Sequence, residues 1–283
     1  MKIAISVEST ADLNQELINK YDIKVIPFTV ELGERVDKDG VITPEDIFTY
    51  VDKTGILPRT SAINQFEYDD YFKHLIKEYD AVIHISLSEN LSSAFVHARD
   101  CAFKYTNIFV INSKSLSTGI GLLAIYAAKL RDKEYEPKEI VSRVKARIPY
   151  VQASFVVNTL SYLHKGGRCT GVQKFGAMLL RLKPQIVVRD GAMEPGEKYR
   201  GKSITCVEEY CKDTLNEFTN PDKSLVFITH SHATEDMINV CREWLKDYGF
   251  TNIVETIAGA TITSHCGPKT IGILFINDGG VEI

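Results

Sequence analysis

This chain lacks the features that mark membrane, secreted and nucleic-acid-binding proteins. No apolar run approaches the roughly 18 residues that a membrane-spanning helix needs. The opening segment MKIAISVEST leads straight into a predicted strand and has no apolar signal-peptide region or cleavage site. A formal net charge of −4 gives no general positive field for nucleic acid. These absences predict a cytoplasmic globular protein without a nucleic-acid partner.

Paired cysteines and the common ATP-binding signature are absent as well. The six cysteines are scattered without a C-x-x-C pair, which is typical of a reduced compartment. No G-x-x-x-x-G-K-[ST] motif occurs, so we do not expect ATP to bind through a P-loop. The composition is that of an ordinary globular protein, with 44% hydrophobic and 25% charged residues. The 283 residues are enough for one large domain or two medium ones.

Strand-like and helix-like segments alternate along the chain. Strands are predicted at 2–7, 24–32, 81–87, 107–111, 153–159, 225–229, 252–257 and 271–276, and Pro27 interrupts the second of them. Thr43, Pro44 and the acidic residues after them predict the start of a helix, and residues 57–61 are expected as a loop before a helix at 65–79. The alternation implies a mostly parallel sheet with right-handed crossovers. We therefore predict an α/β fold with two α/β domains, 1–152 and 153–283. The first would have a Rossmann-like sheet, and the second would be smaller with a mixed sheet. A further helix is expected between Gly171 and Leu182.

The stretch AVIHISLSENLSSAFVHA, residues 81–98, is the most informative part of the sequence. Its β-branched run predicts a buried strand that ends at Leu87, and Ser92 and Ser93 stand where the next helix would begin. Serine is a favoured N-cap, and a helix N-terminus favours an anionic ligand. In an open α/β sheet this turn lies at the carboxyl ends of the strands, where ligands usually bind. On this stretch alone, helix capping is the favoured interpretation of the two serines.

Two other patterns suggest ligand sites only weakly. Gly119, Gly121 and Ala124 fit the dinucleotide pattern G-x-G-x-x-G/A, but their strand is too distant and the expected acidic residue is missing. We interpret these glycines as close helix packing. His230 and His232 lie on one face of a strand end, but no nearby acidic or thiol set completes a metal site. An ordinary strand-end loop is the favoured interpretation.

Two clusters late in the chain remain ambiguous from the residues alone. Gly166 and Gly167 permit close backbone approach, and Arg168 beside them could reach an anion. A helix C-cap with a solvated arginine explains the same residues. His265 is predicted in a glycine-rich turn before the last strand, next to Cys266. Sequence neighbours rarely form a nucleophile–base pair, and a lone histidine is usually structural.

Taken together, these motifs resemble the DegV family of lipid-binding proteins, which includes the fatty-acid-binding subunits of bacterial fatty acid kinase. The markers are SVESTADL, Thr60-Ser61, LSENLSSAFVHA, Asn112-Ser113, LSYLHKGGR and SHCGPKTIG. The resemblance implies a long-chain fatty acid buried between two α/β domains. It implies that the carboxylate is held by Thr60, Ser61, Ser92 and His265. Further candidates near the carboxylate are Ser93, Gly166, Gly167 and Arg168.

The sequence departs from the family pattern at several positions. Ile63 and Asn64 stand where the threonine–serine loop usually continues with proline and serine. Lys269 replaces the usual glycine after Gly-Pro, and Glu8 replaces an aspartate in the opening motif. The residues expected to hydrogen bond to the carboxylate survive these changes. Chain-length preference and the shape of the entrance are therefore not predicted.

The resemblance implies a lipid carrier with no cofactor and no catalytic machinery of its own. Its expected partner is an ATP-dependent kinase subunit that phosphorylates the bound carboxylate for phospholipid synthesis, with transient contact to a membrane surface. Burial contributes about 0.8 kcal/mol per methylene, and hydroxyl donors offset the cost of burying the carboxylate. The alternative is an acyl hydrolase that uses Ser92 and His265. It lacks the G-x-S-x-G elbow around the serine.

Overall fold

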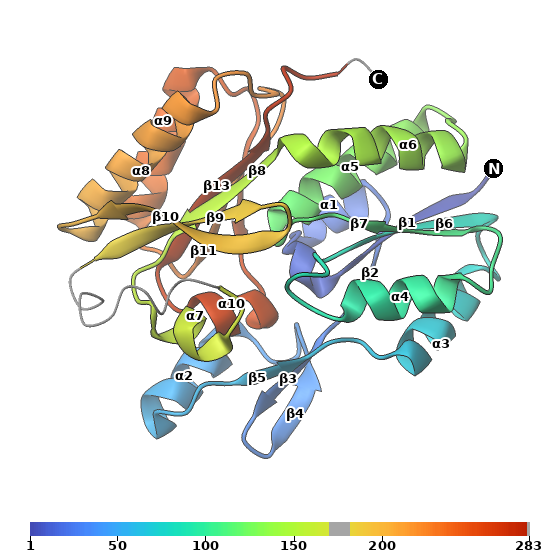
Figure 1. The fold of residues 1–283 in the computed structure, drawn as a ribbon, viewed down its shortest axis with the longest axis horizontal. Helices are drawn as coiled ribbons and strands as arrows, with labels where there is room; N and C mark the ends of the chain where they lie inside the picture. The colour runs from blue at the N-terminus through green and yellow to red at the C-terminus, as the bar shows by residue number, and fades with distance from the viewer. Residues whose placement is uncertain (170–181, 282–283) are drawn as a thin grey trace.

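The computed structural model describes residues 1–169 and 182–281. Within them the chain forms an α/β fold with a four-stranded parallel sheet, a six-stranded mixed sheet and a three-stranded antiparallel sheet (Figure 1). The predicted fold class is confirmed, whereas the small third sheet was not expected. The predicted helix between Gly171 and Leu182 falls on residues 170–181, which lie outside the described residues. None of the helices in the described part of the chain has the length and apolar character to span a membrane.

The parallel sheet has the strand order β2-β1-β6-β7. Its strands are β1 (Ile3–Glu8), β2 (Ile23–Ile26), β6 (Ala81–Ser86) and β7 (Ile108–Asn112). Every residue of β1 and β6 is buried because helices cover both faces. The helices near this sheet are α1 (Gln15–Lys20), α3 (Gln65–Leu75), α4 (Ala94–Ala102), α5 (Thr118–Asp132) and α6 (Pro137–Arg147). Helices α3 and α4 lie on one side, and α5 and α6 on the other (Figure 1).

Helix α5 joins the two large sheets. It packs against β1 and β6 of the parallel sheet and against β8 and β13 of the mixed sheet. Twelve of its fifteen residues are consequently buried. A Cβ atom on Gly121 would lie 2.7 Å from Cδ2 of Leu13, and one on Gly119 would lie 2.2 Å from Oγ of Ser115. The glycines therefore permit close packing, as the sequence predicted.

The mixed sheet has the order β10-β9-β8-β13-β11-β12. Its strands are β8 (Val151–Val156), β9 (Lys183–Arg189), β10 (Ala192–Tyr199), β11 (Val226–Ser231), β12 (Ile253–Ile257) and β13 (Thr270–Ile276). Strands β11 and β12 pair in parallel, and the other neighbours pair antiparallel. Helices α8 (Ser203–Glu217) and α9 (Glu235–Tyr248) pack on this sheet. The mixed sheet is confirmed, and the domain boundary between residues 152 and 153 remains a prediction.

The third sheet corrects two predictions. The single strand expected at 24–32 is wrong: the chain forms β2 and then β3 (Thr29–Leu32), which belong to different sheets. Pro27 lies between them and has no N–H to continue a ladder. The segment expected as a loop before α3 contains a short strand, β5 (Arg59–Ser61), and β4 (Arg35–Lys38) completes the sheet.

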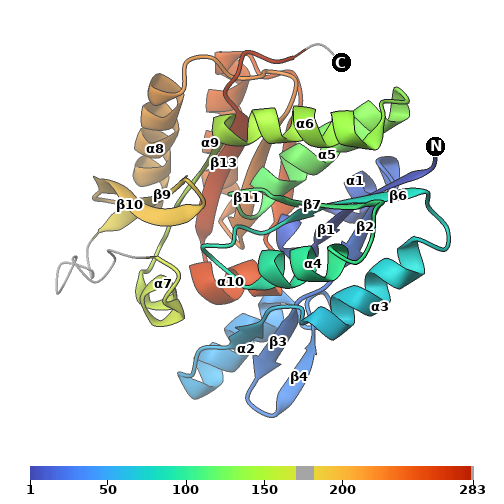
Figure 2. The ribbon, with the colours of Figure 1, turned by 45° about the vertical axis from the view of Figure 1, so that its right-hand side comes forward.

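Two short helices and α2 lie beside the three-stranded sheet (Figure 2). They are α2 (Pro44–Thr54), α7 (Ser161–Gly166) and α10 (Ala260–Cys266). Helix α2 starts where the sequence predicted, with a reciprocal capping box between Thr43 and Asp46. Helix α10 packs against both α7 and α2. Helix α10, late in the chain, therefore contacts α2 and β3, which follow β2 early in the chain.

A buried ion-pair cluster ties α6 to the end of the chain and allows a stability test. The guanidinium of Arg147 lies 2.8 Å from Asp222 and 2.7 Å from Asp278. We expect Arg147→Ala to lower the free energy of unfolding by about 3 kcal/mol, since both carboxylates lose a largely buried partner. Arg143→Ala, on the same helix, removes an exposed pair with Glu139 and should lower the free energy of unfolding much less than Arg147→Ala does. Equal losses in urea unfolding would contradict this assignment.

Candidate functional site

A cavity of about 150 Å³ lies where the loops of the parallel sheet meet α10. Its apolar wall includes Leu87, Leu116, Ile262 and Cys266. The polar residues that line it are Thr60, Ser92, Ser93, Arg168, Thr261 and His265. Segments more than 200 residues apart thus converge on one small space, whose wall holds both polar and apolar groups. We call it the head-group cavity.

His265 is the central polar group of this cavity. Its Nε2 lies 2.7 Å from Oγ1 of Thr60. The predicted turn around His265 is wrong, because the residue lies in the last turn of α10. Burial lowers the pKa of His265 to about 4, and the positive charge of Arg168 adds to this shift. A neutral imidazole protonated on Nε2 would donate to Thr60, which frees the threonine hydroxyl to donate to a ligand.

The turn between β6 and α4 adds Ser92 to the lining of the cavity. Its Oγ accepts a hydrogen bond from the N–H of Ala94 at 3.2 Å. Ser93 holds the N-cap position of α4 without a side-chain capping bond and is exposed. The capping interpretation therefore holds for Ser92 alone. Because the Ser92 Oγ only accepts in this bond, its proton remains available to an acceptor in the cavity.

Of the remaining predicted residues, some line the cavity and others do not. Ser61 is exposed, and its hydroxyl donates to Glu31 at 3.1 Å, so it is not among the described residues that line the cavity. Gly167 is the left-handed C-cap of α7 with φ of 68°, as the capping interpretation predicted. Arg168 lines the cavity and donates to the carbonyl of Gly166 at 2.7 Å.

Gly166 allows α7 to approach the histidine closely. A Cβ atom at this position would lie 2.8 Å from Nδ1 of His265. That Nδ1 atom is buried and has no hydrogen-bond partner among the described residues, and the same is true of Oγ1 of Thr261. Buried polar atoms are normally satisfied in folded proteins. Two orphaned atoms in residues that line one cavity are consistent with a site that takes a polar group.

Two aspartates that the motif analysis did not single out hold α10 in place. Asp39 accepts hydrogen bonds from the N–H groups of Ala260 at 2.9 Å and Thr261 at 3.2 Å, and Asp12 accepts from that of Gly259 at 2.8 Å. Burial raises the pKa of Asp12 to about 8, and the nearby charge of Asp39 adds to the shift. Asp12 lies within the opening motif SVESTADL, which was the only sequence signal for this role.

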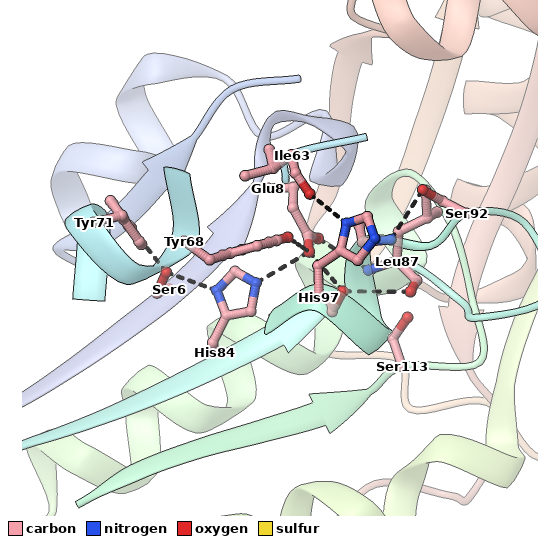
Figure 3. Close-up of polar contacts among 12 residues, drawn as sticks. Ser6, Glu8, Ile63, Tyr68, Tyr71, His84, Leu87, Ser92, His97 and Ser113 are labelled. Carbon is pink, nitrogen blue, oxygen red and sulfur yellow. Dashed lines mark hydrogen bonds and ion pairs between the residues drawn. The ribbon is translucent and has the colours of Figure 1, made fainter. Parts of the chain in front are cut away.

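Glu8 is a third acidic residue whose role the sequence did not reveal (Figure 3). It is fully buried at the end of β1 and accepts hydrogen bonds from Tyr68, His84, Ser86 and the N–H of Leu87. Burial alone would raise the pKa of Glu8, but the charge and hydrogen bonds of His84, with the other donors, hold it below the usual value. The carboxylate is therefore ionised and acts only as an acceptor.

A smaller cavity of about 30 Å³ adjoins the first. Both are lined by Leu116, Ile262 and Cys266, which we call the shared wall. The smaller space, called the inner cavity, lies against β11 and β13 of the mixed sheet, beside Phe155 and Leu274. The shared wall therefore separates the head-group cavity from a second space deeper in the protein.

Other clusters give no support for a metal site or a nucleotide site. Within residues 1–169 and 182–281, no group of three or more histidine, cysteine, aspartate or glutamate residues is placed to hold a metal ion. His230 pairs with Glu255 at 3.2 Å and His232 with Glu45 at 3.1 Å. A larger cavity of about 670 Å³ beside β2 is lined by apolar groups such as Leu13 and Ile23 and by charged groups such as Lys24 and Glu78. It does not include Thr60, Ser92 or His265.

Comparison with known proteins identifies the family. A family profile described as "Uncharacterised protein, DegV family" matches residues 2–278. The chain belongs to the DegV family. A DegV domain-containing protein of Caldanaerobacter subterraneus subsp. tengcongensis is 31% identical over 279 residues, which cover 97% of this chain and 98% of that protein. The family resemblance noted in the sequence is thereby confirmed.

Solved structures of DegV proteins share the fold. A DegV-family protein from Thermus thermophilus, described in terms of fatty acid binding, superposes with a TM-score of 0.91 at 26% identity. The alignment covers 98% of this chain and all of that one. A protein from Bacillus subtilis described as DegV, a fatty acid binding protein, gives a TM-score of 0.85 at 25% identity, with 98% and 100% coverage. The two sheets and the helices that surround the head-group cavity therefore follow the DegV arrangement.

The lowered pKa of His265 gives a pH prediction. In the unfolded chain a histidine titrates near 6.5, whereas in the folded chain His265 should titrate near 4. Between these values the unfolded state binds more protons, so the free energy of unfolding should fall as the pH is lowered through this range. Imidazole proton resonances recorded against pH check the midpoint, with His265→Gln used for assignment. A midpoint near 6.5 would contradict the buried, neutral state.

Proposed function

We propose that this DegV-family protein binds a long-chain fatty acid, with the carboxylate in the head-group cavity and the acyl chain directed towards the inner cavity. The observation that carries the proposal is the convergence of Thr60, Ser92 and His265 at one end of a largely apolar space. The descriptions of the Thermus thermophilus and Bacillus subtilis proteins as fatty-acid-binding support it.

Uncharged hydrogen-bond donors can hold a carboxylate and still leave it able to react. The hydroxyls of Thr60 and Ser92 can donate to the carboxylate oxygens, and charge-assisted hydrogen bonds of this kind offset the loss of water. His265 is uncharged at neutral pH because burial lowers its pKa to about 4. Arg168 is exposed at the edge and adds a positive charge without a buried ion pair.

The inner cavity suits the apolar tail. Its polar side chains are Ser117, Thr229, His230, Ser231 and Thr270. Each of them is hydrogen bonded to another protein group, so none needs a ligand to satisfy it. This contrasts with the head-group cavity, where Thr261 and His265 have orphaned atoms. The difference favours one orientation of an amphipathic ligand, with its carboxylate outward and its chain inward.

The proposal extends to a partner. A carboxylate held by hydroxyls, beside the exposed Arg168 and Ser93, could be phosphorylated by a separate ATP-dependent kinase subunit. The acyl phosphate formed there would feed phospholipid synthesis. In this scheme the DegV-family chain contributes binding and presentation, and the partner contributes the nucleotide and the transfer chemistry.

The acyl hydrolase hypothesis requires His265 to activate Ser92. In the structure Nε2 of His265 pairs with Thr60, and Oγ of Ser92 is engaged with the N–H of Ala94. The second ring nitrogen, Nδ1, lacks the carboxylate that would orient it among the described residues. These contacts favour the binding function over the hydrolase.

Extraction and substitution test the proposed function. Mass spectrometry of an organic extract of the freshly purified protein should reveal a stoichiometric long-chain fatty acid. Ser92→Ala and His265→Ala should each weaken binding of hexadecanoic acid about tenfold while the protein stays folded, since each change removes one hydrogen-bonding group from the head-group site. Unchanged affinity in both variants would count against the site. Turnover of an acyl ester that Ser92→Ala abolishes would favour the hydrolase instead.

The shared wall gives a prediction on chain length. A cavity of about 150 Å³ holds a group the size of benzene, so a long acyl chain must widen the wall between the cavities. Cys266→Ala removes one side chain of that wall. We expect it to raise the affinity for hexadecanoic acid relative to octanoic acid by about fourfold, the equivalent of one more buried methylene. Cys206→Ala, at a fully buried cysteine in α8, should leave this ratio unchanged. Equal ratios in both variants would contradict the prediction.

A further inference from the structure

One buried carboxylate hydrogen bonds to α3 and to β6, the elements that lie next in the chain to the segments carrying Thr60 and Ser92 (Figure 3). Oε1 of Glu8 accepts hydrogen bonds from the Tyr68 hydroxyl at 2.8 Å and the Ser86 hydroxyl at 2.6 Å, and His84 Nε2 lies 3.0 Å away. Oε2 accepts the N–H of Leu87 at 2.9 Å. Glu8 is fully buried, and these four groups are its hydrogen-bond partners among the described residues.

The donors come from two parts of the chain, α3 and the end of β6. Tyr68 lies in α3, which begins four residues after Ser61, directly behind the loop that carries Thr60. Ser86 and Leu87 end β6 and start the turn that carries Ser92.

A second contact closes this arrangement. Nδ1 of His97, in α4, lies 2.8 Å from the carbonyl oxygen of Ile63, in the loop after Thr60 (Figure 3). The Thr60 loop is thus held to α4 directly and to β6 through Glu8. These two links hold the loop that carries Thr60 against the elements on either side of Ser92.

We propose that Glu8 is a positioning residue that sets the separation of Thr60 and Ser92 for a carboxylate ligand. The proposal rests on the proposed function. An ionised carboxylate needs donors on both of its oxygens, so it depends on the separation of the two segments, whereas a primary alcohol needs one partner. Loss of a bond to Glu8 should therefore weaken binding of an acid more than binding of an alcohol with the same chain.

The same network provides a matched control. From His84 it continues through Nδ1 to Oγ of Ser6 at 2.9 Å, and from there to the Tyr71 hydroxyl at 2.8 Å. Tyr71 lies in α3, three residues after Tyr68, but it does not bond to Glu8 or to either segment of the cavity. Tyr68→Phe and Tyr71→Phe therefore remove the same atom from the same helix and the same network.

The experiment compares the two tyrosine variants with the unmodified full chain. Dissociation constants are measured for hexadecanoic acid and for hexadecanol, and the melting temperature is recorded by circular dichroism. Tyr68→Phe should weaken acid binding about tenfold, because the displaced Thr60 no longer donates one hydrogen bond to the charged carboxylate of the ligand, and change alcohol binding less than about twofold. Tyr71→Phe should change both less than about twofold, with a comparable melting temperature.

Two further variants keep the inference testable. Glu8→Gln retains the size of the side chain but removes the charge, and it should reduce the preference for acid over alcohol further than Tyr68→Phe does. If Tyr68→Phe does not fold, Ser86→Ala removes the bond on the other segment and carries the same expectation.

Three outcomes would overturn the positioning role. They are equal losses for acid and alcohol in Tyr68→Phe, identical behaviour of the two tyrosine variants, or an unchanged acid preference in Glu8→Gln. In all three the unmodified protein still binds the acid, so the proposed function survives. If the unmodified protein binds neither ligand, the proposed function fails and the positioning role fails with it.

Discussion

The architecture of the candidate site depends on hydrogen bonds that backbone N–H groups donate to the side chains of Glu8, Asp12 and Asp39. Asp12 and Asp39 receive the first N–H groups of α10, which would otherwise be left without partners. The helix carries His265, and the aspartates belong to the first 40 residues of the chain. Each bond thus satisfies a helix end and also fixes a late residue relative to the parallel sheet. Glu8 accepts the N–H of Leu87, directly after β6, and so joins the end of β6 to the end of β1.

Three acidic side chains so close to a proposed carboxylate site raise an electrostatic question. The negative charge is offset in a different way at each of the three side chains. Asp12 has a pKa of about 8 and is largely protonated at neutral pH, so it adds little negative charge. Glu8 is ionised, but His84 and three further donors surround it. Asp39 faces the positive end of α10 through two N–H groups. The negative charge near the cavity is therefore either neutralised by protonation or locally compensated.

The sequence predicted what depends on local pattern and on linear motifs. The alternation of strands and helices gave the α/β class, and Thr43 with Asp46 gave the start of α2. Thr60, Ser92 and His265 were grouped only through the family resemblance, because nothing in their spacing shows that residues more than 200 apart meet. Pro27 was noticed, yet its consequence, a switch from one sheet to another, required the tertiary structure.

The residues whose roles could not be predicted from the sequence have one physical property in common. Glu8, Asp12 and Asp39 act through bonds to backbone N–H groups that are distant in sequence, and no periodicity records such pairs. Helix α10, which contains His265, was also not predicted. It has seven residues and begins after Gly259, where apolar periodicity is too short to separate a helix from a turn. Buried polar partners are thus the part of this site that only the folded chain reveals.

The small volume of the head-group cavity has a consequence for how a ligand would be held. A long acyl chain exceeds the space of about 150 Å³, so binding must move the shared wall and expend part of the gain from burying methylenes. The polar end needs no such movement, because Thr60 and His265 are already paired and Ser92 is fixed by Ala94. A rigid polar end with a yielding apolar wall would hold the carboxylate of ligands of different lengths in one place. That is the geometry a partner enzyme needs if it is to act on the carboxylate whatever the chain behind it.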